Sequence, residues 1–230
     1  MQLLPVTYNP SQSHTVTRRN KRESRATKIV KAAGYDQWGY IVFRGSYDDN
    51  KRWKEYERAF ADFIQRDMDR RTEKNGVVFD PEMRGRLRFL FFDDVSLGVN
   101  DTRGCARQVR PLLPNPREYK LTTHLRWYRS LKGNKDQVFP KGLDVGFCLW
   151  ADEGSIDSLL DRTVDSVPYV IAVDTKNNPD DPKSLERGYE GCCQVALSAL
   201  IEELYPVFEG GCLTLREVYM FANPILRWIG

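Results

Sequence analysis

The sequence predicts an α/β or α+β fold in which one domain, residues 35–230, has a central, mostly mixed sheet of about five strands covered by helices. Short runs of β-branched and aromatic residues alternate along the chain with segments whose apolar residues recur at helical spacing. The chain has 230 residues, 41% of them hydrophobic, which is enough to bury a full core without disulfides. No clear linker divides it, so we expect a single domain.

The first strand and the first long helix are the most strongly predicted elements. The run GYIVFRGSYDDN, starting at Gly39, indicates a strand that ends in a helix cap. From about 50 to 71, aromatic and apolar residues recur every three to five positions among charged residues, which predicts an amphipathic helix. We expect this stripe to pack in the core. It consists of Trp53, Tyr56, Phe60, Phe63 and Met68.

The remaining elements are expected from the same two patterns. Strands are predicted at 87–92, 145–150, 169–173 and within 189–195, and helices after residue 100 and at 117–132, 155–160, 197–204 and 213–221. Strand direction stays open, because the connections are long enough for a parallel crossover or an antiparallel return.

The first 34 residues differ in charge from the rest of the chain. They hold seven basic residues and one acidic residue, a formal charge of +6, whereas the whole chain carries +3, so residues 35–230 carry −3. This predicts a flexible basic arm. Its cluster Arg18, Arg19, Lys21 and Arg22 is interpreted as a solvated tail, a nuclear-import signal or a nucleic-acid contact.

Composition excludes several classes of protein. Two histidines, and five cysteines without Cys-x-x-Cys spacing, argue against a zinc site, and the odd cysteine count favours a reducing compartment. No apolar run approaches the ~18 residues of a membrane span, and the first 30 residues lack the apolar core of a signal peptide. We therefore expect an intracellular protein without a membrane partner, located in the cytoplasm or the nucleus.

Four segments between about residues 39 and 208 carry a resemblance to a known group of proteins. They are GYIVFRGSYDDNKRWKEYE, FCLWADEGSIDSLL, PYVIAVD and YEGCCQVALSALIEELYPVF. In this order they resemble a large group of uncharacterised intracellular proteins of filamentous fungi, which have a Gly-Tyr-x-Val-x-Arg strand, a Trp-containing helix and a later strand ending in Asp-Glu. The resemblance implies a fungal intracellular protein and supplies no activity.

Acidic residues follow four of the predicted strands. They are Asp48 and Asp49, Asp93 and Asp94, Asp152 and Glu153, and Asp174. If the strands are parallel, these carboxylates share the sheet edge where open α/β folds bind ligands, and Asp93, Asp152 and Asp174 become candidate Mg²⁺ ligands. Helix capping competes with this interpretation, because Asp satisfies the free N–H groups where a helix begins. We favour capping and expect no cofactor.

A sharper form of the metal hypothesis rests on one short pattern. Asp152 with Asp174-Thr175-Lys176 resembles the Asp…(Asp/Glu)-x-Lys spacing of Mg²⁺-dependent nucleases, in which two carboxylates bind the metal and the lysine steadies the attacking water or the developing charge. The pattern lacks the glutamate expected on a preceding helix.

Arg44 is the one charged residue within the apolar run of the first strand. An arginine inside a strand is either paired with a carboxylate or directed at an anion. Asp93 and Asp152 are the expected partners, and anion binding is the alternative.

These features favour a non-enzymatic intracellular binding or interaction module with a protein partner. The alternative is a Mg²⁺-dependent phosphoesterase or nuclease-like hydrolase that uses Asp152, Asp174 and Lys176, with the basic arm holding nucleic acid by charge. An enzyme of small molecules that uses Arg44 as an anion clamp is a third class.

Overall fold

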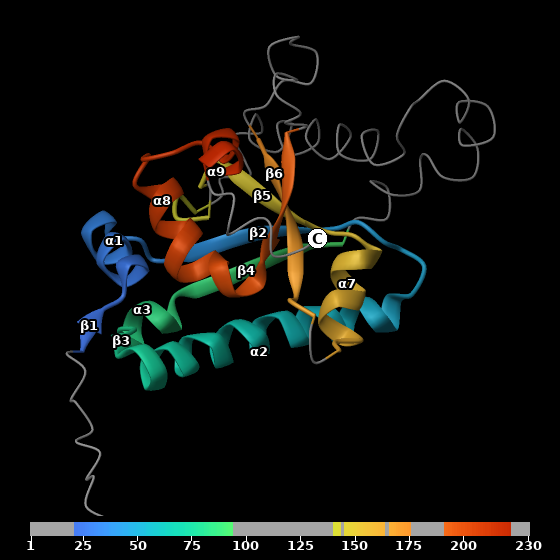
Figure 1. Ribbon diagram of the computed structural model, residues 1–230, viewed down its shortest axis with the longest axis horizontal. Helices are drawn as coiled ribbons and strands as arrows, with labels where there is room; N and C mark the ends of the chain where they lie inside the picture. The colour runs from blue at the N-terminus through green and yellow to red at the C-terminus, as the bar shows by residue number, and fades with distance from the viewer. Residues whose placement is uncertain (1–20, 94–139, 144, 164–165, 176–190, 222–230) are drawn as a thin grey trace, which may run out of the picture.

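The computed structural model describes residues 21–93, 140–143, 145–163, 166–175 and 191–221. A five-stranded mixed sheet in the order β4-β2-β5-β6-β7 lies at the centre, with helices packed against it (Figure 1). The predicted fold class is confirmed. The strands of this sheet are β2 (Trp38–Arg44), β4 (Leu87–Phe92), β5 (Phe147–Ala151), β6 (Tyr169–Asp174) and β7 (Cys192–Ala196).

The helices and a small second sheet complete the described residues. The α-helices are α1 (Arg25–Ala33), α2 (Asn50–Asn75), α3 (Pro81–Gly85), α7 (Glu153–Leu160), α8 (Tyr205–Glu209) and α9 (Leu215–Phe221). The 3-10 turn η2 (Leu197–Ala199) and the π-helix η3 (Leu200–Leu204) precede α8, and β1 (Arg22–Glu23) pairs in parallel with β3 (Val77–Val78). The helices predicted after residue 100 and at 117–132 lie outside the described residues. None of the described helices is long and apolar enough to cross a membrane.

The structure decides the strand directions that the sequence left open. β2 is parallel to both of its neighbours, β4 and β5, whereas β6 is antiparallel to β5 and β7 is antiparallel to β6. The carboxyl ends of β4, β2 and β5 therefore lie at one edge of the sheet, and the carboxyl end of β6 lies at the opposite edge.

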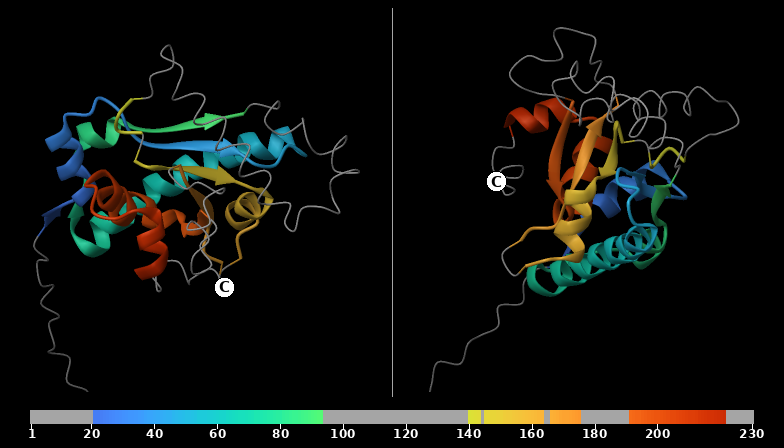
Figure 2. Two further views of the ribbon diagram at one scale, coloured as in Figure 1. Left: turned by 90° about the horizontal axis from the view of Figure 1, so that it is seen from above. Right: turned by 90° about the vertical axis from the view of Figure 1, so that its right-hand side faces the viewer.

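The 26-residue helix α2 covers one face of the sheet (Figure 2). Its aromatic residues pack onto β4, with ring centroids 5.0 Å apart for Phe60 and Phe89 and 5.9 Å apart for Trp53 and Phe91. The predicted core stripe is confirmed except at Phe63, which is only partly buried. The helix ends at Gly76, whose φ of 67° is a left-handed conformation that suits glycine.

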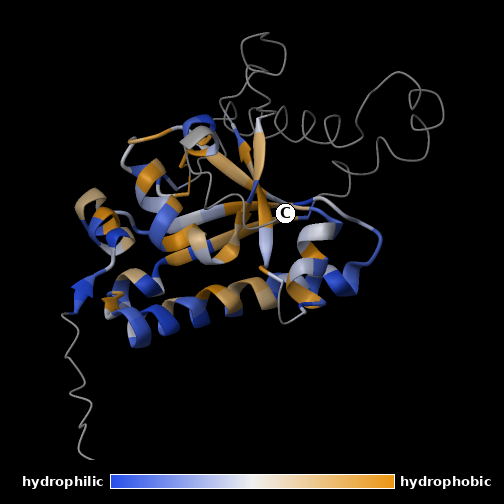
Figure 3. Cartoon of the chain, viewed as in Figure 1, coloured by the Kyte–Doolittle hydropathy of each residue, from blue (hydrophilic) through white to orange (hydrophobic). Residues whose placement is uncertain are grey.

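The other face of the sheet is also buried. Ile41 and Phe43 of β2 lie there with Cys148, Trp150 and Ile171 of the next two strands. All seven residues of β2 are buried, which is typical of a central parallel strand. Figure 3 shows the strands as mostly hydrophobic, whereas α2 alternates between hydrophobic and hydrophilic residues.

The beginning of the described chain differs from the prediction of a flexible arm up to residue 34. Residues 22–34 instead form β1, α1 and its glycine cap, with Ala26 and Val30 fully buried. The helix is stabilised by a distant residue, because Glu202 of η3 accepts hydrogen bonds at its N-terminus. In the predicted basic cluster, Lys21 and Arg22 are exposed, and Arg18 and Arg19 lie outside the described residues.

Residues 197–204 also differ from the single helix expected there, because they form η2 and η3 instead. Pro206 has no N–H to donate to the carbonyl four residues earlier, which is that of Glu202, so regular α-helical bonding is interrupted at this point.

Candidate functional site

The chain leaves the neighbouring strands β2 and β5 toward opposite sides of the sheet. From β2 the chain passes through α2 to β4 on one side, and from β5 it passes through α7 to β6 on the other. In open α/β sheets, ligands bind outside the carboxyl ends of strands at such a switch in direction. The start of α2 and the helix α7 lie beside this edge in two views (Figures 1 and 2). We call this place the switch edge.

Arg44, the last residue of β2, lies at the switch edge with a side chain only 1% exposed. Its Nη1 donates to Asp93 Oδ1 at 3.0 Å and its Nε donates to the Ser46 carbonyl at 2.6 Å. Its Cζ lies 4.7 Å from the ring centroid of Tyr47 and 5.5 Å from that of Trp53. The predicted pairing of Arg44 with an acidic strand end is therefore confirmed, with Asp93 as the partner.

Three buried polar atoms of the switch edge have no hydrogen-bond partner among the described residues. They are Arg44 Nη2, Trp53 Nε1 and the hydroxyl of Tyr56. Leaving one such group unsatisfied costs about 1–3 kcal/mol, and buried polar groups in native proteins are nearly always paired. The described residues therefore supply no acceptor to these three donors.

Tyr56 is a residue of α2, and its buried side chain lies near Asp152 at the start of α7 and Tyr169 of β6. Its ring stacks on that of Trp53, with centroids 5.5 Å apart. Burial raises the pKa of Tyr56 strongly, and the nearby Asp152 and Tyr169 raise it further. The hydroxyl is therefore protonated at neutral pH and able to donate.

Two of the four acidic strand ends cap helices, as predicted. Asp49 accepts hydrogen bonds from the N–H groups of Lys51 and Arg52 at the start of α2, at 2.8 and 3.0 Å. These bonds, first that from Arg52, lower the pKa of Asp49. Asp152 accepts from the N–H of Ser155 at 2.8 Å and from its hydroxyl at 2.7 Å at the start of α7. Oδ1 of each carboxylate is thus used in capping a helix.

The arrangement of β5 and β6 contradicts the proposed set of metal ligands. Asp174 pairs with Phe147, the first residue of β5, whereas Asp152 follows the last residue of that strand. Five residues of strand correspond to about 17 Å, so Asp152 and Asp174 cannot bind one ion. Asp93 pairs with Arg44, and Lys176 lies outside the described residues. Within the described ranges, no group of three or more Asp, Glu, His or Cys could hold a metal ion.

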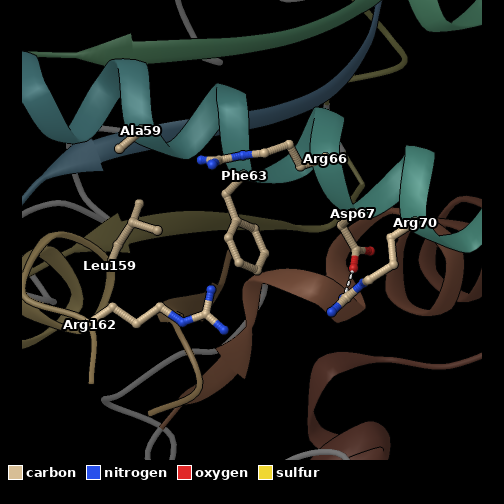
Figure 4. A pocket seen from close by; sticks show the side chains of 7 residues that line it. All are labelled: Ala59, Phe63, Arg66, Asp67, Arg70, Leu159 and Arg162. Carbon is tan, nitrogen blue, oxygen red and sulfur yellow. Dashed lines mark hydrogen bonds and ion pairs between the residues drawn. The ribbon is translucent and has the colours of Figure 1, made fainter. Parts of the chain in front are cut away.

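A second candidate site is an open groove between α2 and α7 with a volume of about 360 Å³, which we call the arginine groove (Figure 4). Its apolar lining is formed by Ala59, Phe63 and Leu159, and its polar lining is formed by Arg66, Asp67, Arg70 and Arg162. The α2 residues recur at helical spacing and so share one face of that helix. The Arg162 guanidinium lies 6.0 Å from the Phe63 ring centroid.

The arginine groove has a local excess of positive charge. Its one acidic residue, Asp67, is buried and pairs with Arg70 and with Nε of Arg71, which donates at 2.7 Å. Arg66 donates from Nε to the carbonyl of Asp62 at 3.2 Å. Neither Arg66 nor Arg162 forms an ion pair within the described part of the chain. The groove therefore presents two arginines without acidic partners above an apolar floor.

Sequence reasoning found Arg44 and missed the arginine groove. Phe63, Arg66 and Arg70 lie one helical turn apart, which was visible in the pattern of α2. Arg162 lies about 100 positions further along the chain, and only the packing of α7 on α2 brings it to them.

Comparisons of the chain with family models, curated proteins and solved structures find no match. The resemblance to the fungal group stays a prediction, and the two sites are interpreted from their geometry.

Proposed function

We propose that this protein is a non-enzymatic interaction module whose arginine groove binds an acidic segment of a partner protein. The observation that carries the proposal is the pair Arg66 and Arg162, which line an open groove without acidic partners in the described residues. An arginine guanidinium binds carboxylates through two parallel hydrogen bonds, so acidic side chains are its natural ligands.

The apolar lining of the groove indicates that the ligand also carries an apolar side chain. Phe63 and Leu159 are partly buried and face the groove (Figure 4). An apolar side chain of the partner would cover them, which is how a peptide is commonly anchored at the centre of an interface. The expected ligand is therefore a segment in which acidic residues flank one large apolar residue.

The charge of residues 35–230 favours a short acidic segment over a long polyanion as the ligand. Residues 35–230 carry a formal charge of −3, so the positive groove is a local feature on an acidic body. A nucleic acid that extends beyond the groove would meet this negative charge, whereas a short segment responds to the nearby arginines.

Ion pairs link α2 to α7, the two helices that form the walls of the groove. Arg52 of α2 pairs with Asp157 of α7 at 2.7 Å and also with Asp161, which directly follows that helix. A site that is ordered in advance loses less conformational freedom on binding.

We place the module inside the cell, in the cytoplasm or the nucleus. This proposal is supported by Cys193 and Cys212, which form no disulfide within the described residues.

Selection of peptides from a phage library tests the proposed function. The full-length protein should enrich peptides with Asp or Glu around a large apolar residue, and the R66E/R162E variant should not. Arg58→Glu is the control, because Arg58 is exposed on α2 outside the groove. Enrichment of the same peptides by the R66E/R162E variant would contradict the proposal.

A binding titration with one selected peptide measures how much each substitution weakens binding. We expect Arg66→Glu to weaken binding at least about tenfold, Arg58→Glu to change it little, and added salt to weaken it. If no peptide is enriched, and a single-stranded oligonucleotide binds the wild type but not R66E/R162E, the groove recognises nucleic acid and the proposal fails.

A further inference from the structure

We infer that the switch edge binds an oxyanion, a phosphate or a carboxylate group, through Arg44 Nη2, Trp53 Nε1 and the Tyr56 hydroxyl. This site is separate from the arginine groove and does not depend on the function proposed for it.

The chemistry of the unpartnered atoms determines the kind of ligand. A guanidinium and an indole N–H donate hydrogen bonds and cannot accept them. A cation therefore finds no ligand in Arg44 or Trp53, whereas an oxygen acceptor satisfies both. Because all three side chains are buried, a donor that lacks an acceptor is unfavourable. Negative charge on the acceptor strengthens each hydrogen bond.

The three donors belong to one small region of the fold. The Arg44 guanidinium lies 5.5 Å from the Trp53 ring, and the Trp53 ring stacks on the Tyr56 ring at 5.5 Å. Trp53 and Tyr56 lie in the first two turns of α2, whose positive end favours a nearby anion. The carboxyl ends of β2 and β5, where this region lies, are the usual place for a ligand in such a sheet.

Two carboxylates face the same region and limit where the anion sits. Asp93 binds Nη1 of Arg44, and its side chain is 28% exposed while that of Arg44 is 1% exposed. Asp93 therefore lies on the solvent side of the pair and competes with an incoming anion. Asp152 lies near Tyr56, and its Oδ1 is bound to Ser155.

This competition predicts an unusual phenotype for Asp93→Asn. Without phosphate the variant should be less stable than the wild type, because a buried guanidinium loses its counter-ion. Phosphate should restore the melting temperature, and the apparent affinity for phosphate should exceed that of the wild type. An Asp93→Asn protein that phosphate fails to stabilise would contradict the inference.

Thermal unfolding of the full-length protein tests the three donors. Phosphate, sulfate and acetate are titrated against chloride at constant ionic strength, and we expect phosphate or acetate to raise the melting temperature. Tyr56→Phe and Trp53→Phe each remove one donor and should weaken the apparent affinity about tenfold. Tyr56→Phe should leave the melting temperature without the anion unchanged or higher, because an unsatisfied hydroxyl is removed.

Tyr40→Phe is the matched control, because the buried Tyr40 hydroxyl donates to the Leu200 carbonyl at 2.7 Å. This variant should melt at a lower temperature and keep the full response to phosphate. Equal responses to chloride and phosphate in the wild type, or an unchanged phosphate affinity in both Tyr56→Phe and Trp53→Phe, would overturn the inference.

A measurement on the wild-type protein covers the case in which these variants do not fold. In two-dimensional NMR spectra, phosphate should shift the indole N–H signal of Trp53. The signal of Trp38, whose Nε1 donates to the Met83 carbonyl at 2.6 Å, should stay in place. A Trp53 signal that does not move at saturating phosphate or acetate would overturn the inference, and a preference for one of the two identifies the group that binds.

Discussion

The carboxylate of Glu202 accepts a 2.7 Å hydrogen bond from the hydroxyl of Ser24, which precedes it by 178 residues. It also accepts from the N–H of Arg25 at 3.2 Å, while Ser24 Oγ accepts from the N–H of Thr27 at 3.2 Å. Ser24 and Glu202 are both buried. This one contact joins the first helix of the described chain to the π-helix near its end.

Ser24→Ala should lower the free energy of unfolding by about 1–3 kcal/mol, because α1 loses its N-cap and the buried Glu202 loses a donor. Urea denaturation followed by circular dichroism measures this difference. Glu23→Ala is the control, since Glu23 is exposed and its pairing with Lys31 lies at the surface. A loss in Ser24→Ala no larger than that in Glu23→Ala would show that the contact is not stabilising.

Phe60→Ala should lower the free energy of unfolding by about 3–5 kcal/mol, because Phe60 is fully buried against Phe89 and Phe91. Phe63→Ala, one turn away, removes a ring that is only partly buried, so the loss should be about 1 kcal/mol or less. Phe63→Ala should instead weaken binding of the selected peptides. The reverse order of stabilities would contradict the burial that the structure gives the two rings.

Stability should fall at alkaline pH because of Tyr35. Its hydroxyl donates to Glu209, and this hydrogen bond, followed by burial, raises the pKa of Tyr35 from 10 to about 12. The folded state therefore holds the proton more tightly, so this contribution is complete below pH 10 and is lost as the pH rises from 10 to 12. The stability difference between the wild type and Tyr35→Phe, measured across this range, should shrink. A constant difference would contradict the assignment.

Two cysteines of the described chain should react with an alkylating agent at very different rates. Burial raises the pKa of the Cys193 thiol to about 12, so almost no reactive thiolate forms at neutral pH. Cys212 is exposed. Iodoacetamide at pH 7.5 followed by peptide mass spectrometry should modify Cys212 much faster than Cys193, and unfolding in urea should make the two rates similar. Rapid labelling of Cys193 in the native protein would mean that β7 opens readily.

Local patterns predicted much of the fold. The strand expected at 87–92 is β4 with the same bounds, and the helix expected from about 50 to 71 is α2, which continues to Asn75. The capping roles of Asp49 and Asp152 were also predicted, since each cap contacts amides within three residues in the sequence. Interactions at such short range can be inferred from spacing alone.

The parts that sequence reasoning missed depend on contacts between distant residues. Residues 25–33, which we expected to belong to a flexible arm, form α1 because Glu202 and the core stabilise them. The antiparallel direction of β6 was not encoded in any local pattern, and it places Asp174 at the opposite edge from Asp152.

By itself, the sequence determined most of the central strands and the long helix α2, which face of α2 is buried, and that Arg44 needs a partner. Only the tertiary structure decided that Asp93 is this partner, that the acidic strand ends do not meet around an ion, and that Arg162 joins Arg66 in a groove. The physical reason is range: helical period, strand composition and caps act over a few residues, whereas strand direction and side-chain clustering depend on how a whole sheet and its helices pack.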